Sequence, residues 1–124
     1  MAEGILRHLG KKDFLALSAG MKPSIVHPLA IMAMAEIGMD IMSQRSKSAG
    51  EYKGWTMDYV ITVCNNAKES CPVFPSTTKL IHWDIMDPVE AEGEEEEKMK
   101  VFRQVRDELI SRICVLFGFS YSMP

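Results

Sequence analysis

The run Tyr-Val-Ile-Thr-Val at residues 59–63 is the feature that most constrains the fold of this chain. It is rich in β-branched side chains and bounded by Asp58 and Asn65, which predicts a strand. Because the run is apolar on both faces, it is typical of the interior of a parallel sheet covered by helices. Weaker strands are predicted at residues 79–83 and, as a short apolar run between polar residues, at residues 14–17.

Helical periodicity predicts the elements that would cover such a sheet. A first helix is expected at residues 1–9, with Gly10 as a left-handed cap, and a second begins at Pro28 and ends at Gly38. A long amphipathic helix begins near Glu94, with apolar side chains at steps of three and four residues. This order of helices and strands predicts an α/β fold, a three-layer sandwich with a mostly parallel sheet.

Composition limits the chain to a few functional classes. With 124 residues, 47% of them hydrophobic and 25% charged, residues 1–124 are predicted to form a single domain. A formal net charge of −3 provides no basic surface for nucleic acid or anionic membrane, so neither partner is expected. No apolar run reaches the roughly 18 residues of a membrane span, and no signal pattern begins the sequence. We therefore expect a cytoplasmic protein.

Two of the three cysteines occupy positions that suit redox chemistry. Cys64 follows the predicted strand at residues 59–63, and Cys71 comes seven residues later in a polar stretch. Reaction sites of open α/β sheets gather at the carboxyl ends of strands, and a loop between two thiols suits sequential thiol–disulfide exchange. The alternative, favoured by spacing alone, is a buried Cys64 and a chance Cys71. Cys114 falls among the apolar positions of the last helix and is interpreted as structural.

Metal and acid–base roles receive weaker support from the sequence. Zinc needs four ligands, and only His82 lies near the two cysteines in sequence, so neither a metal nor another cofactor is predicted. Asp87 precedes Pro88 in a loop after the last predicted strand, where a carboxylate could protonate a leaving oxygen. An Asp-Pro pair is more often only a turn.

Taken together, these segments resemble the thioredoxin-coupled arsenate reductases of the low-molecular-weight protein tyrosine phosphatase superfamily. The resemblance extends from residue 1 to about residue 112. Its most specific part is the pair of cysteines within residues 63–72, because the plain phosphatases lack it. The other segments that follow the family's order are residues 1–4, 18–20, 27–28, 38–41, 44–47, 82–83 and 87–88.

The resemblance implies a relay of three thiols. In the family, a cysteine in an N-terminal C-x5-R loop attacks arsenate and forms a thiol–arsenate adduct. The residue matching Cys64 then displaces arsenite and forms a disulfide. The residue matching Cys71 attacks that disulfide, which leaves a Cys64–Cys71 bond for thioredoxin to reduce. Asp87 would match the general acid, and no cofactor is implied.

The sequence departs from the family at its beginning. It contains no C-x5-R motif, and residue 1 falls where the family's helix after that loop begins. We therefore expect that the first strand is missing and that the chain as given does not reduce arsenate. Alternatives are a non-catalytic, truncated thiol-redox or interaction module and a phosphotyrosine phosphatase, which the cysteine pair disfavours.

The missing strand would leave an exposed sheet edge, through which a homodimer could form. The apolar residues 115–119 could pair into the vacant position, within the chain or by swapping into a neighbour. The favoured alternative is that the last helix simply runs on into this tail.

Overall fold

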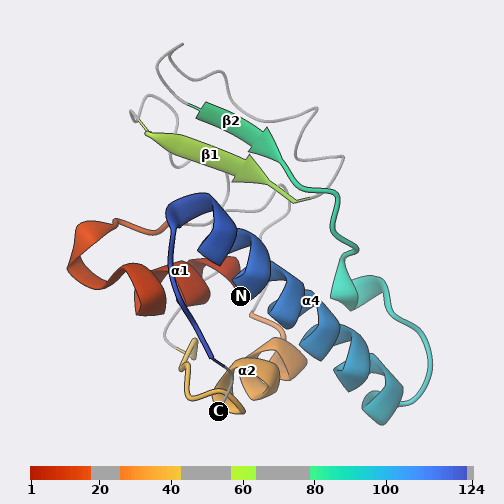
Figure 1. The fold of residues 1–124 in the computed structure, drawn as a ribbon. Coiled ribbons are helices and arrows are strands. Elements are labelled where there is room, and N and C mark those ends of the chain that lie inside the picture. Colours follow the sequence, from red (N-terminus) through yellow and green to blue (C-terminus); the bar gives the residue numbers. More distant parts are fainter. Residues whose placement is uncertain (18–25, 43–56, 64–78, 123–124) are drawn as a thin grey trace.

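The computed structural model describes residues 1–17, 26–42, 57–63 and 79–122, and Figure 1 shows how their elements are arranged. In these residues the α/β class with a parallel sheet is confirmed. None of the described helices is long and apolar enough to cross a membrane. The elements, in chain order, are α1 (Ala2–Gly10), the 3₁₀ turn η1 (Lys11–Asp13), α2 (Pro28–Ala35), β1 (Tyr59–Thr62), β2 (Lys79–His82), the 3₁₀ turn η3 (Pro88–Glu90) and α4 (Glu95–Phe117).

The two described strands, β1 and β2, are paired in parallel, with Tyr59 opposite Lys79 and Thr62 opposite His82. Both agree with the predicted strands to within one residue at their ends. Side chains alternate across a strand, so the face that carries the core-packed Ile61 and Ile81 is opposite to the face that carries Leu80, which is 67% exposed. The described pair therefore has one face against the core and one face that is partly exposed, most of all at Leu80.

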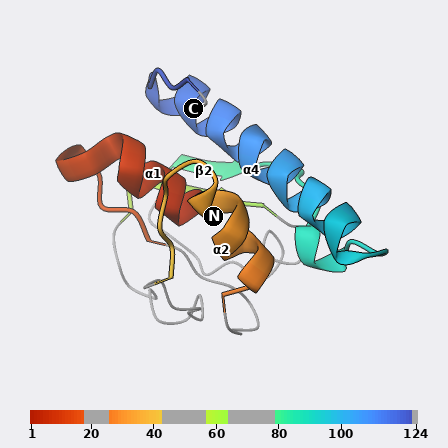
Figure 2. The same cartoon turned by 90° about the horizontal axis from the view of Figure 1, so that it is seen from below.

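Helix α4 supplies much of the core and contacts both α1 and α2. Figure 1 shows it crossing the molecule, with the strands near its C-terminal end, and Figure 2 shows α1 and α2 side by side along it. Its buried apolar side chains repeat at helical spacing, as the sequence predicts. They are Met99, Phe102, Val105, Leu109, Ile110 and Ile113, and α2 meets them with Leu29, Ala30, Ala33 and Met34.

A charged cluster joins the end of α2 to the middle of α4. Arg106 is buried, and its Nη1 donates to the carbonyl oxygen of Ala33 at 2.8 Å and to Glu36 Oε1 at 3.0 Å. Arg103 holds the same carboxylate through Nε and Nη2, the latter 2.7 Å from Oε2. Hydrogen bonding from Arg103, with help from Arg106, lowers the pKa of Glu36 below its ordinary value.

The glycine predicted to end α2 is confirmed, and the structure adds a cap at the start of α2 and a glycine after α4. His27 precedes α2, and its Nδ1 accepts a hydrogen bond from the Leu29 backbone N–H at 3.1 Å, while its ring packs on Phe102. Gly38 and Gly118 follow the two helices with φ values of 77° and 75°. Glycine suits both positions because a side chain is strained in this left-handed conformation.

The predicted left-handed cap at Gly10 is wrong. Gly10 is the last residue of α1 and has φ −82° and ψ −21°, whereas Lys11 has φ 50°. The glycine is needed for space instead of for its backbone freedom, because a Cβ at Gly10 would lie 2.7 Å from the Phe14 ring. A sequence shows that a glycine ends a helix but does not show which of its two advantages is used.

The strand predicted at residues 14–17 does not form. The backbone is extended at Phe14, but no described strand pairs with this segment. A strand requires a neighbour for its ladder, and here the Ala16 carbonyl oxygen accepts instead from Arg7 Nη2 at 3.0 Å. The local apolar run therefore predicted the backbone shape but not the pairing.

The idea of a strand at residues 115–119 is also wrong within the chain, because α4 continues to Phe117. The aromatic side chains at its end pack in edge contacts with rings from two other segments. The Phe117 ring lies 5.0 Å from that of Phe14 and 5.1 Å from that of Tyr59, and Phe119 lies 5.4 Å from Phe14. The tail thus adds to the packing between α4, β1 and the segment after α1.

Candidate active site at the carboxyl ends of the strands

The carboxyl ends of β1 and β2 lie at one edge of the sheet because the strands are parallel. The last backbone bond of the ladder runs from the Trp83 N–H to the Thr62 carbonyl oxygen at 2.8 Å. Trp83 and Ile85 are buried, so the segment that leaves β2 is anchored in the core. The Arg112 guanidinium of α4 lies 5.9 Å from the Trp83 ring centroid and adds a cation–π contact.

A side-chain hydrogen bond joins the two strand ends. Thr62 Oγ1 lies 2.7 Å from His82 Nδ1, and the hydroxyl donates or accepts according to the tautomer of the ring. The sequence analysis did not predict this pair, since it considered His82 only as a metal ligand. The register of the two strands would have indicated the pair. When Tyr59 lies opposite Lys79, Thr62 lies opposite His82.

The two cysteines predicted to carry the redox chemistry, Cys64 and Cys71, lie outside the described residues. Cys64 follows directly after Val63, the last described residue beyond β1. Their predicted roles, including a bond between them, therefore stay predictions.

Asp87 lies at the start of η3, five residues after the end of β2. Its Oδ1 accepts a hydrogen bond from the Val89 backbone N–H at 3.0 Å, so the Asp-Pro pair forms the capped turn that such a pair commonly forms. The side chain is solvent-exposed, which leaves its second oxygen available for another partner. Its role as a proton donor is untested by this geometry.

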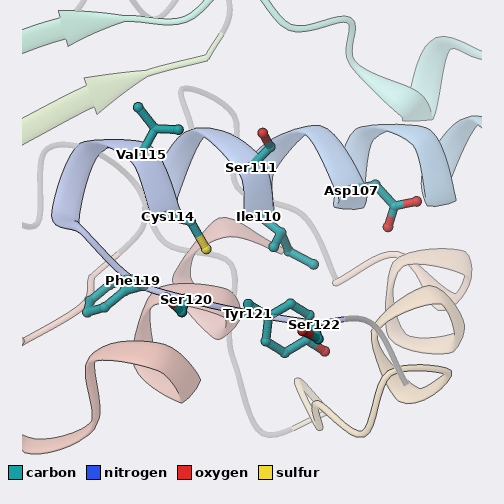
Figure 3. A pocket seen from close by; sticks show the side chains of 9 residues that line it. All are labelled: Asp107, Ile110, Ser111, Cys114, Val115, Phe119, Ser120, Tyr121 and Ser122. Carbon is teal, nitrogen blue, oxygen red and sulfur yellow. The ribbon is translucent and has the colours of Figure 1, made fainter.

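Cys114 occupies the position that the helical pattern predicts for it. It is half-buried on α4, packs against the core and is a free thiol. As Figure 3 shows, it also lines a groove between the end of α4 and the chain that follows it, with a volume of about 520 Å³. The side chains of Ser111, Ser120, Ser122 and Tyr121 form part of the same lining.

No metal centre can be assembled from the described residues. Within residues 1–17, 26–42, 57–63 and 79–122, no three His, Cys, Asp or Glu side chains are grouped so that they could hold an ion. His82 already uses Nδ1 for Thr62.

Comparison with known proteins identifies a family. Residues 1–118 match the model described as low molecular weight phosphotyrosine protein phosphatase. The arsenate reductase of Halalkalibacterium halodurans is 42% identical over 113 residues, which cover 91% of this chain and 81% of that protein. That of Shouchella clausii is 40% identical over the same coverage. A solved arsenate reductase in the oxidized state matches 94% of this chain and 85% of its own, with a TM-score of 0.80 and 30% identity.

Proposed function

This chain belongs to the low molecular weight phosphotyrosine protein phosphatase family, and from that premise we propose that its function is arsenate reduction by cysteine thiols. The observation that carries the proposal is its similarity, at about 40% identity over most of both chains, to proteins named arsenate reductase. The substrate is an oxyanion of arsenic, and the electrons come from a thiol reductant.

In the proposed relay, Cys64 and Cys71 carry the last two steps. The Cys64 thiolate attacks a sulfur that bears arsenic, an S–S bond forms, and arsenic takes up the two electrons and leaves as arsenite. The Cys71 thiolate then attacks the Cys64 sulfur, which releases the first thiol and leaves a Cys64–Cys71 disulfide. A thioredoxin-type dithiol reduces that bond and becomes the disulfide itself. Asp87, in the exposed turn after β2, supplies the proton to a leaving oxygen.

The relay also needs a first nucleophile within an oxyanion-binding loop, and no C-x5-R motif occurs in the 124 residues. A second candidate is a thiol-redox or interaction module without turnover of its own, which the thiols of Cys64 and Cys71 would also serve. Turnover is measured in an assay that couples thioredoxin and its reductase to NADPH oxidation. The 124-residue chain assayed alone should oxidise NADPH at the background rate when arsenate is added, because backbone N–H groups and an arginine must hold the oxyanion.

Disulfide mapping tests the relay in the chain itself. Mild oxidation should lower the intact mass by about 2 Da, since two thiols lose two hydrogens when they join. Trypsin cleaves after Lys68, so Cys64 and Cys71 leave on separate peptides, residues 54–68 and 69–79, and a linked pair is diagnostic. Reduced thioredoxin should separate them.

Two variants control this experiment. Cys114→Ser should form the same linked peptides, and Cys71→Ser should form none. A linkage of Cys64 to Cys114, or no linkage at all, would contradict the relay. The cytoplasm, a reducing compartment, is the proposed location.

A homodimer through the sheet edge stays a prediction. Light scattering on the protein as it elutes from a size-exclusion column measures its mass and checks this prediction.

A further inference from the structure

The segment that follows α4, residues 119–122, folds back along the helix that it leaves. Gly118 turns the chain out of α4 with φ 75° and ψ 27°. Figure 3 shows the segment running back along α4, on the side of the helix where α1 and α2 lie. Residues 1–118 match the family model, so the matched part of the fold ends where this segment begins.

Side chains of the segment alternate between the core and solvent. Phe119 and Tyr121 are half-buried and pack against the core, whereas Ser120 and Ser122 are exposed. A period of two is that of extended backbone with one apolar face. The Phe119 ring makes an edge contact with the ring of Phe14, with 5.4 Å between their centroids. The segment is therefore held to the core by two aromatic side chains.

Backbone hydrogen bonds fix only the start of the segment. The N–H groups of Gly118 and Phe119 both donate to the Cys114 carbonyl oxygen, at 2.8 and 3.0 Å. Beyond them, no backbone hydrogen bond joins residues 120–122 to another part of the chain that the structure describes. A segment with few backbone bonds and half-buried side chains opens locally at low cost. Opening therefore requires the release of little more than two rings.

Gly118 provides a hinge for such an opening. A Cβ at this position would meet no atom within 4 Å, so space does not require a glycine there. The left-handed backbone does, because side chains are strained in it. The direction in which the segment leaves α4 therefore depends on the conformation of this one residue.

The segment lies over the thiol of Cys114. This side chain is half-buried on α4. Figure 3 shows its sulfur pointing toward the segment, whereas Val115 points to the other side of the helix. Cys114, Ser120 and Tyr121 line the same groove of about 520 Å³. A reagent that approaches the sulfur from this side must therefore pass residues 119–122.

We propose that residues 119–122 form a lid, hinged at Gly118, that limits the reaction of the Cys114 thiol with other molecules. In the closed position, the rings of Phe119 and Tyr121 hold the lid against the core. The lid slows thiol–disulfide exchange, in which the Cys114 thiolate would form a new S–S bond while the other sulfur leaves as a thiolate. A shielded Cys114 does not compete with the thiols of the relay. That benefit rests on the proposed function, but the shielding does not.

Alkylation of the reduced full chain by iodoacetamide tests the lid. Trypsin releases Cys114 on the peptide 113–124, so its rate is measured separately from those of the other thiols. Phe119→Ala removes the ring that contacts Phe14 and should speed alkylation of Cys114 about tenfold at pH 8. Ser120→Ala is the matched control, since it changes an exposed side chain of the same segment. Its rate should stay within about twofold of wild type.

Substitutions at the hinge should have smaller effects. Gly118→Ala strains the closed position through its left-handed backbone and should speed alkylation of Cys114 severalfold. Gly118→Asn should lie between this variant and wild type, because asparagine tolerates the left-handed conformation better than alanine does.

Urea separates opening of the lid from unfolding of the whole chain. Opening of a short segment exposes little surface, so the rate at Cys114 of the wild-type protein should rise by no more than about twofold per molar urea below the unfolding transition. If the thiol reacted only after global unfolding, the rate would rise at least about fivefold per molar.

Two outcomes would overturn the lid. One is a Phe119→Ala variant whose Cys114 reacts at the wild-type rate. The other is the steep urea dependence of global unfolding in the wild-type protein. Failure of the relay is seen elsewhere, because disulfide mapping reads the peptides 54–68 and 69–79 and the lid is read on the peptide 113–124.

Discussion

The interface between α2 and α4 and the carboxyl edge of the sheet are held together by different means. The helical interface combines a row of buried apolar side chains with Arg106, Arg103 and the Glu36 carboxylate. In the described residues the strand edge is made by β1 and β2, one face of which carries the exposed Leu80, and by the side-chain bond between Thr62 and His82. We therefore expect the α2–α4 interface to contribute more to the free energy of unfolding than the strand edge does.

Replacing a leucine by alanine in each of the two regions should give the largest difference in the free energy of unfolding. Leu109→Ala, at a position only 5% exposed on α4, should lower the free energy of unfolding by about 2–5 kcal/mol, because it leaves a cavity. Leu80→Ala, at the exposed position on β2, should cost less than about 1 kcal/mol. Urea titrations followed by circular dichroism measure both. A single transition in each would also support the prediction of one domain, and equal costs would break the comparison.

Replacing the buried Arg106 should have the next-largest effect on the free energy of unfolding. Arg106→Met keeps most of the volume but leaves the Ala33 carbonyl oxygen without its donor, so we expect a cost of about 1–3 kcal/mol. Arg112→Met is the matched control, because the ion pair of Arg112 with Glu108 is solvent-exposed and worth less than about 1 kcal/mol. The same titrations apply. If Arg112→Met lowered the free energy of unfolding more than Arg106→Met, the contact of Arg112 with the Trp83 ring would contribute more to stability than the helical interface does.

Acid should weaken the helical interface through Glu36, with a smaller effect. The Arg103 guanidinium lowers the pKa of this carboxyl in the folded state, so the folded protein binds the proton less readily than the unfolded chain. The resulting stability is present above the ordinary carboxyl pKa near 4.5 and is lost as the pH falls through the lower folded value. Melting temperatures measured from pH 6 to pH 3 should fall less steeply for Glu36→Gln. Parallel curves for the two proteins would contradict this assignment.

Much of the fold could be predicted from local pattern. The β-branched run before Cys64, the proline at the start of α2 and the apolar repeat of α4 each predicted their elements to within about two residues. These signals are strong because a few neighbouring residues determine the preferred backbone. The weaker predictions failed where the outcome depended on a distant partner, as for the segment at Phe14.

The candidate site was predicted less completely. Residue type and position after a strand made Cys64, Cys71 and Asp87 candidates, and the family resemblance implied their roles. The structure describes only Asp87, as a helix cap. The pairing of Thr62 with His82 was missed, because twenty residues separate them and only the register brings them together. Hydrophobic periodicity cannot predict polar pairs of this kind, because it describes one helix or strand at a time.

The sequence by itself determined the α/β class, the position of most elements and the thiols available for chemistry, since these follow from local propensity, hydrophobic period and residue type. Only the tertiary structure decided that Gly10 is needed for the Phe14 ring, that Phe117 closes the end of α4 against Tyr59, and that His82 is held by Thr62. Each of these depends on the distance between residues far apart in the chain, which is determined by packing and register.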